Sequence, residues 1–359
     1  MPVSKQSNGW TDVAGMAISL VLIAAIVVGL ALFFDFTNGF HDASSVVATV
    51  IASGALDIRK AIMFAATFTL LGALVGGSAV IYTVQKIILI EPGHTLLVTL
   101  LTGLIGATIW NMFTWKVGMP SSSTHALIGS LVGAAIVSQG IYQVQWGFTA
   151  VMGPDHHISG VLKVLIALLI SPPIGFGMAF ALQKGITFSL RNKTRRANKW
   201  LKRLQWGTVA LLAYSQGAND TQKHMGVIML ALLSAGLVSG TDVPFAIRIV
   251  TGVIMLMGYL GGGWTIMKTL GQKIYRLEPI HSLSSQVSSA TAVLTSTLLG
   301  GPISTTQVVG SSVLGVGAGD RVRMVSWRVG EEMLLSWFIT IPATMGVAAL
   351  LYPLIGFII

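Results

Sequence analysis

The sequence contains two aspartates, Asp42 and Asp220, that lie among apolar residues and end the same local pattern. The first ends the stretch NGFHD at 38–42, and the second ends QGAND at 216–220. A carboxylate inside a membrane segment costs at least about 2.5–3.5 kcal/mol on insertion scales, so a bound cation, a proton or a basic side chain must offset it. A position at the membrane boundary, in contact with water, is the alternative, but it does not explain why both aspartates follow the same glycine-containing pattern. We therefore expect Asp42 and Asp220 to bind a cation, with Na⁺ as a candidate at both.

Amide and imidazole side chains accompany the two aspartates and complete the expected cation site. Gly39 and Gly217 allow the backbone to unwind, which frees carbonyl oxygens for a hard cation such as Na⁺. His41 takes in the first stretch the place that Asn219 takes in the second, and it can carry a proton or form a hydrogen bond in the helix packing. The residues expected to hold or couple the cation are Asp42, Asp220, Asn38, His41 and Gln216.

Lys223 follows Asp220 by three residues, so the two side chains share a face if the segment is helical. The lysine can pair with the aspartate, attract an anion, or extend to the membrane edge as an ordinary snorkelling lysine. His125 and His224 can carry protons, although a lone histidine in a membrane more often forms a hydrogen bond within the packing. The polar residues of this region that we expect to contact a substrate are Asn219, Gln222 and Lys223.

Two clusters of hydroxyl side chains follow prolines, in the stretches PSSSTH at 120–125 and PISTTQ at 302–307. A proline followed by serine and threonine is typical of a helix start, and each cluster lies inside a charge-free run too long for one crossing. We expect half-helices or re-entrant hairpins with N-termini inside the membrane, which is tolerated where they line a cavity; an extramembrane turn with ordinary capping is the alternative. A helix N-terminus binds phosphate-like anions. The hydroxyls expected to hold a tetrahedral anion from both sides are Ser122, Ser123, Thr124, Ser304, Thr305 and Thr306.

The composition identifies the elements that carry these residues as membrane helices. Of the 359 residues, 53% are hydrophobic and 9% are charged, and the mean hydropathy is +0.78. A soluble domain needs more polar surface than this, whereas charge-free runs long enough to cross a bilayer recur along the chain. We predict an all-α integral membrane protein with about ten to twelve transmembrane segments, some of them discontinuous or re-entrant.

The chain repeats the same order of features on either side of its middle. The two aspartate patterns are 178 positions apart, the glycine-rich stretches around 72 and 258 are 186 apart, and the two proline–hydroxyl clusters are 182 apart. Three matches in the same order indicate one unit used twice. Such repeats in membrane proteins are commonly inverted, with the ligand held where interrupted helices meet. We predict a first membrane repeat at 1–183, a basic linker at 184–205 and a second membrane repeat at 206–359.

The basic linker predicts the orientation of the chain. Eight of the 22 lysine and arginine residues fall between Lys184 and Arg203, with no acidic residue among them. By the positive-inside rule this segment faces the cytoplasm, and it can also contact anionic lipid. Because the linker explains much of the net charge of +10, we expect no nucleic-acid partner. The predicted location is the plasma (cytoplasmic) membrane, the cell inner membrane, with several passes through the bilayer.

The sequence lacks the patterns that mark common enzymes. It has no Walker-type glycine loop, no paired-histidine zinc spacing and no nucleophile elbow. It contains no cysteine, which excludes thiolate metal and redox sites. We therefore expect no enzymatic activity and no cofactor.

Four stretches resemble the inorganic phosphate transporters of the PiT family. They are DFTNGFHDASSVVA at 35–48, GANDTQKHMGVI at 217–228, which is similar to bacterial members in particular, WN at 110–111 with GMPSSSTH at 118–125, and PISTTQ at 302–307. The likeness spans nearly the whole chain. It implies a cation-coupled symporter of inorganic phosphate that is built from inverted repeats and forms a homodimer in the bilayer. The resemblance also implies that the two signature aspartates are required for transport and that the coupling ion is Na⁺ or H⁺.

Other functions stay open on the sequence alone. Sulfate is similar to phosphate in size and shape, but phosphate near neutral pH keeps a proton that it can donate to a carboxylate, and sulfate has none. The two aspartates therefore favour phosphate, and a permease for metal–phosphate complexes would have the same fold. An anion channel, in which the polar stretches only pack helices, is a further alternative. Paired half-helices favour alternating access over a channel.

Overall fold

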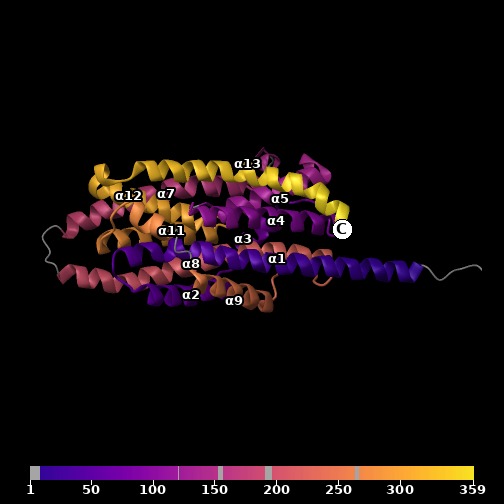
Figure 1. Ribbon diagram of the computed structural model, residues 1–359, viewed down its shortest axis with the longest axis horizontal. Helices are drawn as coiled ribbons and strands as arrows, with labels where there is room; N and C mark the ends of the chain where they lie inside the picture. Colours follow the sequence, from indigo (N-terminus) through magenta and orange to yellow (C-terminus); the bar gives the residue numbers. More distant parts are fainter. Residues whose placement is uncertain (1–8, 120, 153–156, 191–195, 263–266) are drawn as a thin grey trace, which may run out of the picture.

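The computed structural model describes residues 9–119, 121–152, 157–190, 196–262 and 267–359. These residues form an elongated bundle of α-helices, and no strand occurs among them (Figure 1). The helices of 17 residues or more within the described ranges are α1 (Gly9–Ala52), α2 (Ile58–Val75), α4 (His94–Val117), α5 (Ser123–Gln139), α7 (Gly160–Leu190), α8 (Arg196–Ser234), α9 (Phe245–Gly261), α11 (Pro279–Leu298), α12 (Thr305–Arg321) and α13 (Trp327–Ile358).

Short helical pieces join the long helices. The α-helical pieces are α3 (Ala79–Gln85) and α6 (Phe148–Met152), and the tighter or wider turns are η1 (Ile141–Gln143), η2 (Thr269–Lys273) and η3 (Val322–Met324). α3 packs against α8, and η2 packs against α1. The two longest helices, α1 and α8, are thus each contacted by a short element that precedes a hairpin.

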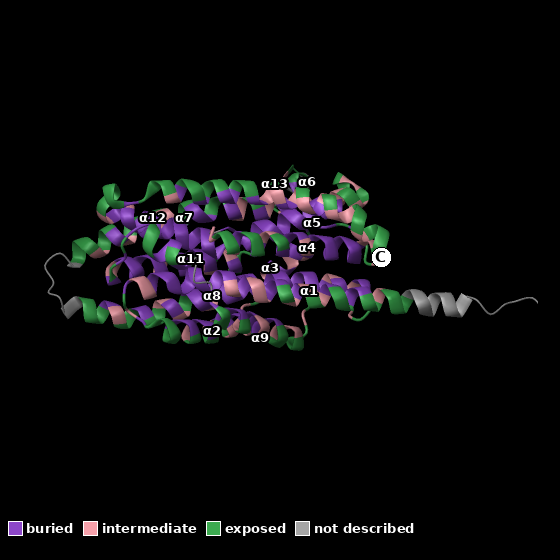
Figure 2. Ribbon diagram, viewed as in Figure 1, coloured by how far each residue is buried: buried purple, intermediate pink, exposed green. Residues whose placement is uncertain are grey.

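The helices have the length and surface of membrane-spanning segments. Within the part of the chain that the structure describes, five apolar helical stretches are long enough to cross a bilayer: Ala17–Ala52, Ile58–Val75, His94–Val117, Gly160–Ser189 and Trp327–Ile358. Figure 2 shows a buried interior and an exposed outer surface, and large apolar side chains such as Phe357 and Leu350 lie on the outside. Apolar surface of this kind is stable when it faces lipid tails. The predicted all-α membrane fold is confirmed.

Helices of each half of the chain pack against helices of the other half. α5 packs against α13 and α12 against α7, while α1 packs against α9 and α8 against α2. Figure 1 shows α12 and α5 towards opposite ends of the bundle. Two equivalent units that point in opposite directions give this arrangement, which is that of inverted repeats.

Each half contains a helical hairpin that reverses inside the protein. Gly118 directly follows α4, which ends at Val117, and Gly300 lies two residues after the end of α11 at Leu298; these glycines have φ of 75° and 70°. That left-handed conformation is open to glycine and costly for most other residues. The two glycines are 182 positions apart, like the hydroxyl clusters that follow them. The predicted interrupted helices are present, although Pro120 of the first cluster lies outside the described residues.

The predicted unwinding at Gly39 and Gly217 is wrong. α1 is helical from Gly9 through Ala52 and α8 from Arg196 through Ser234, so both glycines lie inside continuous helix. Backbone carbonyls at these positions are therefore used within the helix and are not freed for a cation.

The two glycines instead permit close helix crossings. A Cβ added to Gly39 would lie 2.5 Å from the carbonyl oxygen of Met255 on α9, and one added to Gly217 would lie 2.1 Å from that of Thr69 on α2. Real Cβ atoms do not approach backbone atoms this closely, so only glycine fits. Each aspartate-bearing helix is thus fixed against a helix of the other half.

The basic segment at 184–205 is largely helical where the structure describes it. Residues 184–190 end α7 and residues 196–205 begin α8, while 191–195 lie outside the described residues. Figure 1 places the end of α7 and the start of α8 at the same end of the bundle. The division into two repeats and a linker remains a prediction.

Candidate functional site

The hydroxyl clusters begin two helices in the interior of the protein. Ser122 Oγ accepts a hydrogen bond from the backbone N of His125 at 3.1 Å and caps α5. Ser304 Oγ accepts one from the backbone N of Gln307 at 3.4 Å and caps α12. Serine is a favoured N-cap because its oxygen satisfies an amide that the helix leaves unpaired. Both serines are buried, so two positive helix ends lie inside the bundle.

Asp42 contacts hydroxyls from both half-helices. Thr306 Oγ1 donates to Asp42 Oδ1 at 2.8 Å, and Ser123 Oγ donates to Asp42 Oδ2 at 3.5 Å. His41 Nδ1 lies 3.2 Å from Asp42 Oδ1. The carboxylate is 2% exposed, so these groups replace water around it. The helix α1 therefore contributes its aspartate directly to the point where α5 and α12 begin.

Asp220 occupies the corresponding place on α8. Lys223 Nζ forms an ion pair with Asp220 Oδ1, and Gln216 Nε2 donates to Asp220 Oδ2 at 2.5 Å. Thr305 Oγ1 donates to Asp220 Oδ2 at 3.5 Å. This contact is the counterpart of the one between Ser123 and Asp42, because the two hydroxyls are 182 positions apart.

Lys223 connects the second aspartate to both hairpins. Its Nζ donates to Thr124 Oγ1 on α5 at 2.5 Å and to the carbonyl oxygen of Ile303, which precedes α12, at 3.0 Å. The side chain is 2% exposed. Snorkelling to the membrane edge is therefore excluded, and the lysine is an internal positive charge.

A local twofold axis passes between the two helix starts. Gln307 Nε2 lies 2.9 Å from His125 Nδ1, and these two residues hold equivalent positions in the two hydroxyl clusters. Ser45 and Lys223 each follow an aspartate by three residues, and each contacts a threonine of the opposite half, at 3.4 Å and 2.5 Å. Residues at equivalent positions of the sequence repeat thus make equivalent contacts in the structure.

The cluster combines groups for an anion with groups for a cation. Helix N-termini, hydroxyl donors and a lysine suit a tetrahedral oxyanion. Carboxylate and hydroxyl oxygens suit a hard cation such as Na⁺. All of these side chains are buried, so electrostatic attraction between them and a bound ion is screened little. The arrangement can hold an anion and a cation side by side away from bulk water.

Comparison with known proteins decides the family. A sequence model described as the phosphate transporter family matches residues 38–348. The chain belongs to the phosphate transporter family. The PiT resemblance of the sequence is thereby confirmed.

Bacterial members of the family are similar over their full length or most of it. A Bacillus subtilis protein named "Probable low-affinity inorganic phosphate transporter" is 36% identical over 345 residues, which cover 94% of this chain and 99% of that protein. A Mycobacterium tuberculosis H37Rv protein with the same name is 38% identical over 347 residues, covering 96% of this chain and 80% of the relative. These relatives are named as transporters, which supports the expected non-enzymatic role.

A solved structure shares the fold of this phosphate transporter family member. It is described as "The sodium-dependent phosphate transporter", and the match has a TM-score of 0.78 at 24% sequence identity. It covers 94% of this chain and 100% of that chain. The likeness shows that this chain shares its overall fold with that solved structure.

Asn219 of this family member holds the second hairpin in place. Its Nδ2 donates to Thr297 Oγ1 at 2.9 Å and to the carbonyl oxygen of Gly301 at 3.1 Å, and its Oδ1 accepts from the backbone N of Ile303 at 3.2 Å. The amide was expected to contact substrate. In the structure Asn219, which directly precedes Asp220, holds the loop before α12 in place.

The side-chain amide of Gln222 has hydrogen-bond partners, whereas that of Asn38 has none among the described residues. Gln222 Oε1 accepts from the backbone N of Val80, and its Nε2 donates to the carbonyl oxygens of Gly76 and Ala218. Its amide therefore positions α3 and does not join the aspartate cluster. Asn38 is fully buried one helical turn before Asp42, and neither atom of its amide has a hydrogen-bond partner among the described residues.

Tyr259 is a member of the site that the sequence reasoning missed. Its hydroxyl donates to Gln216 Oε1, and Gln216 in turn holds Asp220. The tyrosine is fully buried on α9, inside the glycine-rich stretch that marks the repeat. That stretch pointed to helix packing, but nothing local in it revealed the contact with Gln216, which is 43 residues away.

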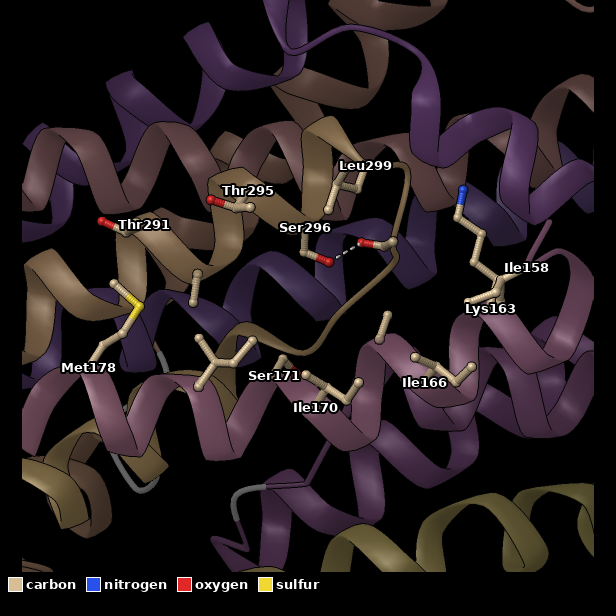
Figure 3. Close-up of a pocket in the computed structure, with 14 residues that line it drawn as sticks. Ile158, Lys163, Ile166, Ile170, Ser171, Met178, Thr291, Thr295, Ser296 and Leu299 are labelled. Atoms are coloured by element: carbon tan, nitrogen blue, oxygen red, sulfur yellow. Dashed lines mark hydrogen bonds between the residues drawn. The ribbon is translucent and has the colours of Figure 1, made fainter. Parts of the chain in front are cut away.

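An apolar cavity lies beside the second hairpin. It has a volume of about 380 Å³ between α7 and α11, and side chains such as Ile166, Ile170 and Met178 line it (Figure 3). Ser296 Oγ at its edge donates to the carbonyl oxygen of Gly301 at 3.0 Å and closes the hairpin loop. Neither aspartate and none of the six candidate hydroxyls lines the cavity. It is therefore separate from the site that suits an ion.

Proposed function

We propose that this protein is a symporter that carries inorganic phosphate across the membrane together with a cation by alternating access. The observation that supports the proposal most strongly is the single buried cluster in which Asp42 and Asp220 meet the starts of α5 and α12. The names of the similar transporters, which mention inorganic phosphate and sodium dependence, support the same function.

Phosphate is proposed to bind between the two helix starts. Its oxygens accept hydrogen bonds from amides of the first turns and from the hydroxyls, while the ammonium of Lys223 supplies positive charge. A hydroxyl can rotate from a carboxylate to an incoming oxyanion without moving the backbone. The proposed contacts are Ser122, Ser123, Thr124, Ser304, Thr305, Thr306 and Lys223, with Asn219 ordering the loop and Gln222 acting only through α3.

The two aspartates favour phosphate over sulfate. A monohydrogen or dihydrogen phosphate can donate its proton to Asp42 or Asp220, whereas sulfate brings only acceptors and would meet the carboxylates with like charge. This discrimination requires both aspartates to lie within reach of the anion. Their contacts with Thr306 and Thr305 support that requirement.

The cation is proposed to bind the carboxylate oxygens next to phosphate. Na⁺ is the candidate at Asp42 and Asp220, with the nearby side chains of Asn38, His41 and Gln216 as further ligands or as groups that position the carboxylates. The free amide of Asn38 supports this role, because a buried amide without a partner is costly and a bound ion relieves that cost.

Alternating access is proposed to use the two hairpins as gates. They enter from opposite ends of the bundle and meet at the site, so movement of one opens one side only. We further propose repeats at 1–183 and 206–359 as the moving units, a homodimer in the cytoplasmic membrane, and the segment 184–205 on the cytoplasmic side.

Uptake of labelled phosphate into vesicles that contain the purified protein tests this function. A Na⁺ gradient and a pH gradient are imposed separately, and phosphate should accumulate above equilibrium with at least one of them. Asp42→Asn and Asp220→Asn should each abolish accumulation, while Asp57→Asn, at an exposed surface pair with Lys60, should not. Passive equilibration without accumulation would indicate a channel, and stronger competition by sulfate than by phosphate would refute the proposed substrate.

A further inference from the structure

A second buried acidic residue lies outside the cluster described above. Asp35 on α1 and His224 on α8 approach each other with Oδ1 and Nδ1 2.6 Å apart. Asp35 is 0% exposed and His224 is 2% exposed. Among the described residues, neither carboxylate oxygen of Asp35 has a hydrogen-bond partner, and the imidazole of His224 is the one basic group within ion-pair distance of it. We refer to these two residues as the acid–imidazole pair.

The acid–imidazole pair lies next to the proposed phosphate site. Asp35 precedes Asp42 by seven residues and His224 follows Asp220 by four, which at 1.5 Å per helical residue is about 10 Å and about 6 Å along the axes. α1 and α8 run in opposite directions (Figure 1), so both offsets point the same way, away from the end where α8 begins. The pair is therefore about one to two helical turns from the aspartates, between the site and the opposite end of the bundle.

Because the pair is buried, the state with one bound proton is favoured. Imidazolium with carboxylate, and imidazole with carboxylic acid, are both neutral overall and contain the same extra proton. Loss of that proton leaves a net negative charge in a low-dielectric interior, which is costly without a compensating cation. The rings of His224 and Phe34 pack edge to face with centroids 5.2 Å apart, so an apolar side chain covers part of the imidazole.

No other charged group compensates the pair. Within the described ranges, Asp35 and His224 form ion pairs only with each other. The neighbouring helices carry ionisable groups that lie beyond ion-pair distance from both. These groups are His41, Asp42, Lys199, Lys202, Arg203, Tyr214, Asp220 and Lys223 on α1 and α8, Arg59 and Lys60 on α2, Tyr82 on α3, His94 and Lys116 on α4, Arg248 and Tyr259 on α9, Lys273 on η2, His281 on α11, and Asp320 and Arg321 on α12.

The pair has no counterpart in the other half of the chain. At the repeat spacing of 178 positions, Asp35 corresponds to Ala213 and His224 corresponds to Val46. Both of these residues are buried and apolar. The repeated helix packing is therefore achieved without an ion pair at the symmetric place. A costly buried acid that the fold does not require needs another reason for its presence.

We infer that Asp35 and His224 form a proton-binding site and that one proton bound there crosses the membrane with each phosphate. The inference rests on the proposed phosphate transport and assigns part of its coupling to this pair. When α1 and α8 separate on the side away from the start of α8, water reaches the imidazole, and Nδ1 takes a proton from hydronium. Closure restores the neutral pair. When the opposite gate opens, water that enters through the phosphate site accepts the proton.

Full-length protein in vesicles separates proton coupling from phosphate binding. Two quantities are measured with labelled phosphate at zero membrane potential: accumulation driven by a pH gradient of about one unit, and exchange at equal pH on both sides. One coupled proton converts one pH unit into about tenfold accumulation, because one pH unit is a tenfold ratio of proton activity. Asp35→Asn and His224→Gln should lose this accumulation and keep exchange within about twofold of the unaltered protein.

Matched substitutions control for the amino-acid changes themselves. Asp57→Asn and His94→Gln alter exposed residues and should leave both measurements unchanged. Asp35→Glu keeps a carboxyl group, so unlike Asp35→Asn it should retain pH-driven accumulation, with a shifted pH dependence. A purely structural role would not produce that shift.

Three results would overturn the inference. Normal pH-driven accumulation in both Asp35→Asn and His224→Gln would show that the pair carries no coupled proton. Parallel loss of accumulation and exchange in well-folded variants, with no rescue by Asp35→Glu, would indicate a structural role. Accumulation by the unaltered protein with a Na⁺ gradient but not a pH gradient would exclude proton coupling while leaving phosphate transport intact. Absence of both exchange and accumulation in the unaltered protein would instead refute the proposed function, on which this inference rests.

Discussion

The hydrogen bond from Thr306 to Asp42 offers a quantitative test of the closed site. Thr306→Val removes the donor and keeps the shape of the side chain, which is 1% exposed. The bond is 2.8 Å long and its acceptor is a buried carboxylate. Hydrogen bonds to charged groups contribute about 1.5–3 kcal/mol. At about 1.4 kcal/mol for each factor of ten, the closed arrangement should become about ten- to hundredfold less populated.

The neighbouring residue provides a matched control. Thr305 is also 1% exposed, and its hydroxyl contacts Asp220 at 3.5 Å, the outer limit of a hydrogen bond. Thr305→Val makes the same chemical change one residue away, and it removes the same kind of phosphate contact but only a weak contact with an aspartate. Since both hydroxyls belong to the proposed phosphate site, the difference between the two variants isolates the contact with Asp42.

Phosphate–phosphate exchange in vesicles measures the effect, because every exchange cycle passes through the closed arrangement. We expect the initial exchange rate of Thr306→Val to lie about ten- to hundredfold below that of Thr305→Val, because both variants lose a phosphate contact and only Thr306→Val loses the bond to Asp42. Equal rates in the two variants, or an unchanged rate in Thr306→Val, would refute the reasoning from these two distances.

Two further predictions concern stability and are measured as the Tm of the purified protein in detergent. Gly39→Ala should lower the Tm by an amount that reflects about 1–3 kcal/mol of overpacking, because its Cβ would lie 2.5 Å from the carbonyl oxygen of Met255, whereas Gly29→Ala, with open space around it, should not. A Tm unaffected by Gly39→Ala would contradict the close crossing of α1 and α9. Lys223→Met should lower the Tm more strongly, since an unpaired buried carboxylate costs about 3–5 kcal/mol. Addition of Asp220→Asn should recover most of that loss, and a failure to recover it would show that Lys223 stabilises the fold in another way.

The helix starts and the aspartates could be recognised in the sequence because their chemistry is local. Ser122 and Ser304 each stand two residues after a proline, which is typical of a helix start, and the structure uses both serines as N-caps. Asp42 and Asp220 stand out because burial of a carboxylate needs a compensating partner. The contacts of Thr306 and Ser123 with Asp42 bring these two regions together in the structure.

Other features depend on contacts between distant segments and could not be derived locally. Gly39 suits both unwinding and close packing, and only the position of α9 decides for packing. Lys223 contacts Thr124, which is 99 residues away, so its internal position follows from the hairpin and not from its own neighbours. Gln222 likewise turns to α3 because Val80 presents a free amide there.

The pairing of Asp35 with His224 was also hidden in the sequence. The two residues are 189 positions apart and have no matching pair at the repeat spacing, so the internal symmetry that revealed the other polar contacts gave no signal. His224 alone resembled a packing histidine. Its partner becomes apparent only when α1 and α8 are seen side by side.

A density map of the protein with phosphate bound tests the central claim most directly. The account predicts phosphate between the N-termini of α5 and α12, within hydrogen-bond distance of the hydroxyls of Ser123 and Thr305 and next to the ammonium of Lys223. Phosphate bound elsewhere, for example on the basic segment at 184–205, with the two helix starts free of it, would contradict the account.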